Sequence, residues 1–171
     1  MTGTPELQQA VKIVDPTPYF HYLEERFGIP PSTFDGYVLV QPGRKKVYIV
    51  TADHRPPVRP RPRTVGLPFL RIYLKFPKLS TAAAQQFGHA ATRNVIDTDA
   101  AQAEAFLTRR DFRARLEQLS RCTGRGYVLV RYQGHTLGVG FLIPEEAGGR
   151  VESMLPRSWA RDPASFSLTA P

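Results

Sequence analysis

The spacing of hydrophobic residues near the start of the chain predicts helical structure. Phe20, Leu23 and Phe27 recur at helical intervals and define one apolar face, so the charged residues between them, including Arg26, are expected to face water. Residues 1–15 carry a weaker pattern of the same kind, which fits either a short helix or a frayed terminus. The beginning of the chain is therefore predicted to contain one firm helix.

Alternating and β-branched residues then predict strands, followed by a second helix. The runs Tyr37–Val40 and Val47–Val50 flank Pro42-Gly43, whose turn chemistry makes them the two arms of a hairpin. The stretch GLPFLRIYLKF predicts one or two further strands, and STAAAQQFGHAA predicts a helix capped by Ser80 or Thr81. This order of elements predicts an α/β first half.

A proline- and arginine-rich segment, HRPPVRPRPRTV at residues 54–65, interrupts these strands. Because proline lacks the N–H that a sheet interior requires, we expect an extended, mobile surface loop. No acidic residue occurs from His54 to Ile96, although this stretch contains many arginines and lysines. Two partners fit such a loop: a phosphate backbone that the arginines follow, or a peptide-binding domain that recognises Pro-x-x-Pro.

The second half predicts one helix among strands. A short strand at Asn94–Ile96 precedes DTDAAQAEAFL, a helix whose acidic residues lie at its amino end, where the helix dipole favours them. GYVLVRYQGHTLGVGFLIP predicts two strands around Gln133-Gly134, and Arg150–Leu155 predicts a third. The pattern is that of a small β-barrel with one helix at its entrance.

Composition adds a strong positive charge to this picture. The 171 residues include 23 Lys+Arg, mostly arginine, against 15 Asp+Glu, which gives a net charge of +8 and a pI near 10. Arginine suits bidentate phosphate contacts and stacking on bases, so this balance favours a nucleic acid as partner, although a genome rich in G and C would also favour arginine. No apolar run reaches membrane-spanning length, and no ordinary signal peptide is recognisable.

Taken in order, these motifs make the second half resemble a PUA domain, the small RNA-binding pseudo-barrel of pseudouridine synthases and archaeosine transglycosylases. The resemblance rests on the helix ending AFL, the basic turn TRRDF, the strands GYVLVRYQGHTLGVGFL and the ending GRVESMLPRSWAR. It is most similar to the PUA-like tail of Sun-type rRNA cytosine methyltransferases and covers about Arg93–Arg161. The preceding part, from FGIPPSTFDGYVLV to STAAAQQFG, looks like the pre-PUA α/β domain of small ribosome-biogenesis factors.

The resemblance implies that RNA lies in a groove between the entrance helix and the adjoining strand. Without it, the arginines that follow this helix would most simply complement the helix dipole and stay solvated. PUA domains usually have a glycine directly after the helix, whereas Thr108-Arg109-Arg110 stand here, which predicts a wider turn. The candidate RNA contacts are Arg93, Arg109, Arg110, Arg113, Arg125, Arg131, His135, Arg157, Trp159, Arg161, Lys75 and Lys78.

Two details of this region carry alternatives. Arg157, Trp159 and Arg161 alternate, so in an extended segment they share one side, where the tryptophan either stacks on a base or plugs the end of the barrel. Gly138 and Gly140 form a G-x-G, but a strand continues after it, so it is not a phosphate cradle; glycine there either lets backbones approach closely, which we prefer, or leaves room for a ligand.

Patterns typical of enzymes are not recognisable. The four histidines are scattered, so no metal is expected, and the single Cys122 excludes an internal disulfide. Cations near Cys122 predict a lowered pKa for its thiol. The paired catalytic cysteine motif of Sun-type methyltransferases, a glycine-rich S-adenosylmethionine site, a P-loop and a G-x-S-x-G elbow are all missing. We therefore expect no catalytic residue and no cofactor.

The whole sequence predicts an α+β protein in four parts: an extension (1–15), a pre-PUA-like α/β domain (16–92), a PUA-like domain (93–162) and a tail (163–171). We expect non-catalytic binding of structured RNA in ribosome biogenesis or RNA modification, with rRNA or pre-ribosomal RNA first and tRNA next. The alternative is an RNA-recognition subunit of an rRNA or tRNA modification enzyme whose catalytic domain is supplied in trans. We further expect a cytoplasmic monomer away from membranes, with ribosomal precursor proteins or a modification enzyme as protein partners.

Overall fold

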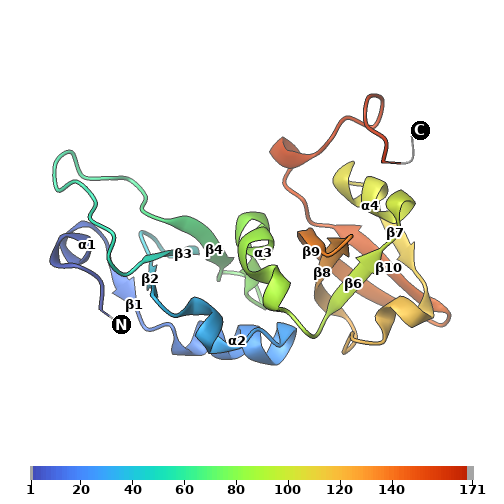
Figure 1. Cartoon of the computed structure of the whole chain (residues 1–171), viewed down its shortest axis with the longest axis horizontal. Helices are drawn as coiled ribbons and strands as arrows, with labels where there is room; N and C mark the ends of the chain where they lie inside the picture. Colours follow the sequence, from blue (N-terminus) through green and yellow to red (C-terminus); the bar gives the residue numbers. More distant parts are fainter. Residues whose placement is uncertain (1, 169–171) are drawn as a thin grey trace.

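The computed structural model describes residues 2–168, in which two β-sheets lie side by side along the long axis of the molecule (Figure 1). The first sheet is antiparallel and follows the sequence: β1 (Ile13–Val14), β2 (Tyr37–Val40), β3 (Lys46–Thr51), β4 (Leu67–Arg71) and β5 (Lys78–Leu79). The second has the order β6 (Val95–Thr98), β8 (Gly126–Tyr132), β9 (His135–Glu145), β10 (Gly148–Ser153) and β7 (Phe112–Ala114). In it β6 runs parallel to β8, and the other described pairs are antiparallel.

Local capping explains where the helices begin and end. The α-helices of the described residues are α1 (Pro5–Ala10), α2 (Thr17–Phe27), α3 (Thr81–Phe87) and α4 (Ala100–Leu107). Gly28 ends α2 with a φ of 64°, and the Ser80 hydroxyl begins α3 by accepting a hydrogen bond from the Ala83 N–H at 3.0 Å. Asp99 and Gln102 form a capping box at the start of α4. Short 3₁₀ turns cover Pro31–Phe34, Gly88–Ala90, Leu116–Leu119 and Arg157–Trp159.

One hydrophobic core extends across both halves of the chain. Helix α3 packs against β4 of the first sheet and β9 of the second (Figure 1). The same buried cluster contains Phe69 of β4, Phe87 of α3, Leu129 of β8 and Val139 of β9. A separate buried cluster consists of Phe106 of α4 together with residues of the second sheet. Because the first cluster draws on both sheets, we expect the two halves to unfold together.

Polar contacts also join the end of α2 to the second sheet. Arg26 was expected to face water, but it is half-buried, and its Nε and Nη2 donate to the Tyr127 carbonyl at 3.0 and 2.8 Å. Asn94 is fully buried; its side-chain amide donates to the Arg26 carbonyl at 2.6 Å and accepts from the Thr123 N–H at 3.0 Å. The helical pattern showed only that Arg26 lies off the main apolar face. It did not show that the second sheet packs against this other side of the helix.

The α+β class predicted from the sequence is confirmed, and of the two glycines of the G-x-G, Gly140 has a close backbone neighbour, the Glu152 carbonyl. A Cβ on Gly140 would lie 2.8 Å from Val151 of the neighbouring strand, so only glycine fits there. Residues 1–15 contain both α1 and β1, and β7 escaped prediction because its three residues are too few to show alternation. The predicted domain bounds at 16–92 and 93–162 stay a prediction.

Segment 54–65 and the predicted tail contact the rest of the protein in different ways. Segment 54–65 contains neither helix nor strand, and its arginines are exposed, while Pro56 and Val65 are buried. In the predicted tail, 163–171, the Ser167 hydroxyl and the Leu168 N–H donate to the Glu104 carboxylate at 3.0 and 3.1 Å. The last residues of that tail, 169–171, lie outside the described residues.

Candidate nucleic-acid interface

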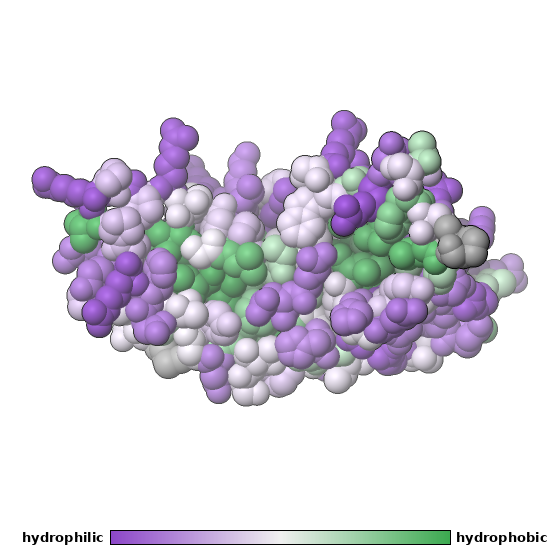
Figure 2. Space-filling view, turned by 45° about the horizontal axis from the view of Figure 1, so that its top comes forward, coloured by the Kyte–Doolittle hydropathy of each residue, from purple (hydrophilic) through white to green (hydrophobic). Residues whose placement is uncertain are grey.

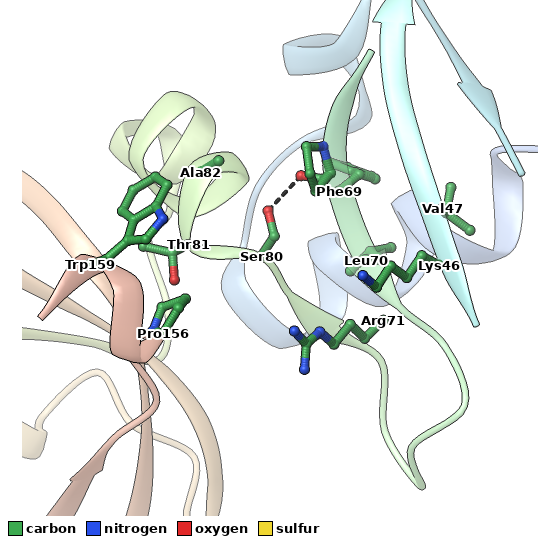
Figure 3. A pocket seen from close by; sticks show the side chains of 11 residues that line it. Lys46, Val47, Phe69, Leu70, Arg71, Ser80, Thr81, Ala82, Pro156 and Trp159 are labelled. Carbon is green, nitrogen blue, oxygen red and sulfur yellow. Dashed lines mark hydrogen bonds between the residues drawn. The ribbon is translucent and has the colours of Figure 1, made fainter. Parts of the chain in front are cut away.

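A groove separates the first sheet from the segment that follows β10 (Figure 3). Two adjoining hollows of about 190 and 340 Å³ form it, and they share Arg71, Ser80, Thr81 and Pro156 in their walls. Figure 3 shows Pro156 and Trp159 on one side of this space and Arg71 with Lys46 on the other. The groove therefore exists only where the two halves of the chain come together.

Cations line both hollows of this groove. Lys46, Arg71, Lys78 and Arg109 contribute to its walls, and no described lining residue is acidic. Within residues 2–168 none of these four side chains forms an ion pair. Burial, together with the charges of Arg71 and Arg109, lowers the pKa of Lys78. An anion in the groove would relieve this repulsion, so the surface is suited to phosphate.

Arg109 projects into the groove from a left-handed turn. Its φ is 59°, a conformation that glycine adopts freely and that costs a residue with a Cβ about 1–2 kcal/mol. The Arg109 N–H donates to the Phe106 carbonyl at 3.1 Å, which closes the turn tightly at the end of α4. The wider turn expected from the missing glycine is therefore wrong. This turn places a cationic side chain at the wall of the groove.

Trp159 lies on the wall of the groove across from Lys46 and Arg71 (Figure 3). It belongs to a 3₁₀ turn and not to an extended segment, so the predicted common side of Arg157, Trp159 and Arg161 does not form. Its side chain is 45% exposed, which contradicts the alternative that it plugs the end of the barrel. The Arg161 N–H donates to the Leu107 carbonyl at 2.8 Å and ties this segment to the end of α4. An exposed indole in a basic groove is available for stacking.

Several predicted contact residues are engaged elsewhere. Arg110 pairs with Glu104 at 3.7 Å, Arg113 pairs with Glu145, and Arg131 is half-buried with its guanidinium donating to the Gly88 carbonyl at 2.9 Å. Arg131 was expected to point to water or phosphate; the 3₁₀ turn after α3 covers it instead. Its side chain therefore holds the turn in place.

The remaining candidates are divided between the surface and a second hollow. Arg93 is exposed and donates to the Glu24 carbonyl at 3.2 Å, and His135, Arg157 and Arg161 are also exposed. Of the residues predicted as contacts, the groove brings together Lys78, Arg109 and Trp159. Sequence reasoning did not select Lys46 and Arg71, although Arg71 belongs to the acid-free stretch that marked this region as basic.

The second hollow lies between α2, the β4–β5 connection and the start of β8, and has a volume of about 750 Å³. Lys75 and Arg125, both predicted contacts, line it together with four aromatic residues. These are Tyr22, Phe76, Tyr127 and Phe141. Figure 2 shows one face of the molecule, on which hydrophobic residues are visible between projecting hydrophilic side chains in both halves.

Cys122 does not have the environment of a reactive thiol. Burial raises the pKa of Cys122, and the nearby Arg26 and Arg121 charges offset this only in part, so the lowered pKa expected from the sequence is wrong. In the described part of the chain, no group of three or more His, Cys, Asp or Glu residues is arranged to hold a metal ion. No helix among these residues is long and apolar enough to cross a membrane.

Comparisons with known proteins agree with this architecture in the second half. Residues 93–161 match the family described as the methyltransferase RsmF PUA domain. The chain is 36% identical over 98 residues to ribosomal RNA small subunit methyltransferase F of Aeromonas salmonicida, and 34% identical over 98 residues to the enzyme of that name from Aeromonas hydrophila. Each match covers 57% of this chain but 19% of the relative, so the chain spans about a fifth of their length. The match over residues 93–161 confirms the resemblance to a PUA domain of the methyltransferase-tail type that the sequence predicted.

Proposed function

We propose that the protein binds structured RNA through the groove. Lys46, Arg71, Lys78 and Arg109 neutralise phosphates, and Trp159 stacks on a base or ribose at the edge of the bound strand. The observation that carries this proposal is the convergence on one concave surface of an exposed tryptophan and four cations that form no ion pair with any described residue. Recognition rests on RNA shape more than on base edges, because the charged residues that line the groove are all cations, which suit the phosphates of the backbone.

The RNA is ribosomal, and the protein acts in ribosome biogenesis or rRNA modification. Support comes from the relatives, whose name is that of a ribosomal RNA small subunit methyltransferase, and from the family of the second half. The described residues contribute recognition and not chemistry in this proposal. A second candidate, favoured by the same match, is that the protein is the RNA-recognition part of a modification enzyme whose catalytic domain acts in trans.

A charge-matched pair of double variants tests the groove. Lys46→Gln with Arg109→Gln removes one lysine and one arginine from its walls, whereas Lys12→Gln with Arg44→Gln removes the same residue types from exposed positions outside it. Binding of a small-subunit rRNA hairpin is measured by fluorescence anisotropy between about 50 and 200 mM salt.

The two double variants have different expected outcomes. The groove variant weakens binding and reduces the slope of log K against log salt by about 2, because each phosphate contact contributes about one unit. The control changes only the long-range field and leaves the slope nearly unchanged. Equal losses for both variants would show that the affinity follows net charge and not the groove.

A further inference from the structure

The second hollow combines an aromatic interior with a cationic rim. Tyr127 and Phe141 meet edge to face, with ring centres 5.4 Å apart, and Phe76 stands 56% exposed on the β4–β5 connection. Tyr22 completes the aromatic set from α2. Burial raises the pKa of Tyr22 to about 12, so its phenol stays neutral and keeps a proton to donate. Flat apolar ligands fit such a site by stacking.

The cations of the rim are placed over these rings. Arg125 lies over the Phe141 ring at 5.6 Å, and the Lys75 ammonium lies 5.5 Å from the centre of the Phe76 ring. Within residues 2–168 neither cation forms an ion pair, whereas the third cation, Arg26, is committed to the Tyr127 carbonyl. The hollow therefore offers an aromatic surface beside two available positive charges.

A single carboxylate, that of Glu25, occurs among the described residues that line the hollow. It is exposed, and its oxygen lies 3.4 Å from Nε2 of His21. A carboxylate there accepts hydrogen bonds from amino groups, which nucleobases carry on their pairing edges. Aromatic faces, phosphate-seeking cations and an acceptor for amino groups are together the chemistry of a nucleotide site.

The hollow is connected to the groove through the β4–β5 connection. Arg71 and Lys78 at the two ends of this segment line the groove, while Leu74, Lys75 and Phe76 between them line the hollow. Arg71 also lies close enough to Tyr127 to influence its pKa. An RNA strand bound by Arg71 and Lys78 can therefore place one of its own nucleotides in the hollow.

We propose that the hollow receives one unpaired nucleotide of the bound RNA, with its base against Phe76, Tyr127 and Phe141 and its phosphate beside Lys75 and Arg125. This inference rests on the proposed function, since the groove supplies the rest of the RNA contact. It makes the protein a reader of bulged or looped-out positions. A fully paired helix has no base free to stack in this way.

The test compares a blunt-ended RNA duplex with the same duplex carrying one bulged nucleotide. The wild-type protein binds the bulged duplex more tightly, by about five- to a hundredfold, which is the range for stacking one base on aromatic side chains. Phe76→Ala removes this preference and leaves the affinity for the blunt duplex unchanged. Leu116→Ala, at a 67% exposed position outside the hollow, retains the preference.

A crosslink gives a second, direct measurement. With 4-thiouridine as the bulged nucleotide, irradiation attaches the RNA to peptides containing Phe76, Tyr127 or Phe141, as read by mass spectrometry. Equal affinity for both duplexes, or crosslinks confined to other peptides, would overturn this inference and leave the groove intact. If the wild-type protein binds neither duplex, the proposed function itself is wrong and the inference falls with it.

Discussion

Replacing Asn94 by alanine should destabilise the whole protein, because this buried side chain joins three distant segments. Its amide group donates to the Arg26 carbonyl at the end of α2 and to the Thr123 hydroxyl at 3.0 Å, and its oxygen accepts from the Thr123 N–H. The residue is fully buried at the start of β6 and has a φ of 50°. Asparagine tolerates this conformation better than other residues with a Cβ.

The size of the effect follows from these contacts. Asn94→Ala removes these partly buried hydrogen bonds and leaves the Arg26 carbonyl and the Thr123 N–H without this partner, at a cost of about 1–3 kcal/mol each. The left-handed backbone adds about 1 kcal/mol for alanine. We expect a total loss of about 3–7 kcal/mol, a large share of the roughly 5–15 kcal/mol by which domains are stable. For a chain of this length, where 1 kcal/mol corresponds to about 2–4 °C, the melting temperature should fall by about 15 °C.

Denaturant unfolding followed by circular dichroism measures this loss. Gln133→Ala is the matched control, because Gln133 also has a positive φ, 47°, but is exposed in the β8–β9 turn. It should change the free energy of unfolding by less than about 0.5 kcal/mol. A loss below about 1 kcal/mol for Asn94→Ala would refute the assigned role of the side chain. Two separate unfolding transitions in the wild type would contradict the core shared by both halves.

Three further predictions concern the interface and its surroundings. Arg109→Gly should keep the free energy of unfolding within about 1 kcal/mol of the wild type, because glycine adopts the left-handed conformation freely. It should nevertheless lower RNA affinity as much as Arg109→Gln does. If the glycine variant unfolds, the left-handed turn at Arg109 is misassigned. Because burial raises the pKa of Cys122, iodoacetamide should alkylate it more slowly than a free peptide thiol at pH 8, with a rate that climbs as the pH rises; a rate above that of the peptide would contradict this environment. Replacing the exposed arginines of loop 54–65 by glutamine should weaken RNA binding at unchanged melting temperature, and a marked drop in that temperature would mean that these side chains are packed.

Local patterns predicted local structure well, and contacts between distant segments were beyond them. The hairpin follows from two β-branched runs, and the strands pair as Val38 with Val50 because both runs alternate in the same register. The environment of Arg26 does not follow from its neighbours, because its hydrogen-bond partner Tyr127 lies 101 residues further along the chain. A helical pattern distinguishes an apolar face from the rest of a helix but does not reveal which distant element covers the rest.

For the same reason, the sequence predicted only some of the residues of the candidate site. Arg109 was found because the turn after α4 and its arginines are adjacent in sequence. Lys46 and Arg71 enter the groove only because α3 brings the first sheet next to residues 153–159, an arrangement that no sequence motif reports. Arg131 illustrates the opposite error, since alternation correctly placed it off the face of Val128 and Val130, where a turn of the first half then covers it.

The ion pairs of the second half explain why a chain of net charge +8 presents its available cations at particular places. Arg113 pairs with Glu145, Arg121 with Asp97, and Arg115 with both Asp99 and Glu117. Exposed pairs of this kind stabilise a fold by no more than about 1 kcal/mol each, so their main consequence is to cancel positive charge where they occur. The cations that line the groove and the rim of the second hollow have no such partners within residues 2–168. A polyanion approaching the protein is therefore attracted to these two sites and to loop 54–65, whose exposed arginines also form no ion pair within residues 2–168, and its attraction weakens with salt as these charges are screened.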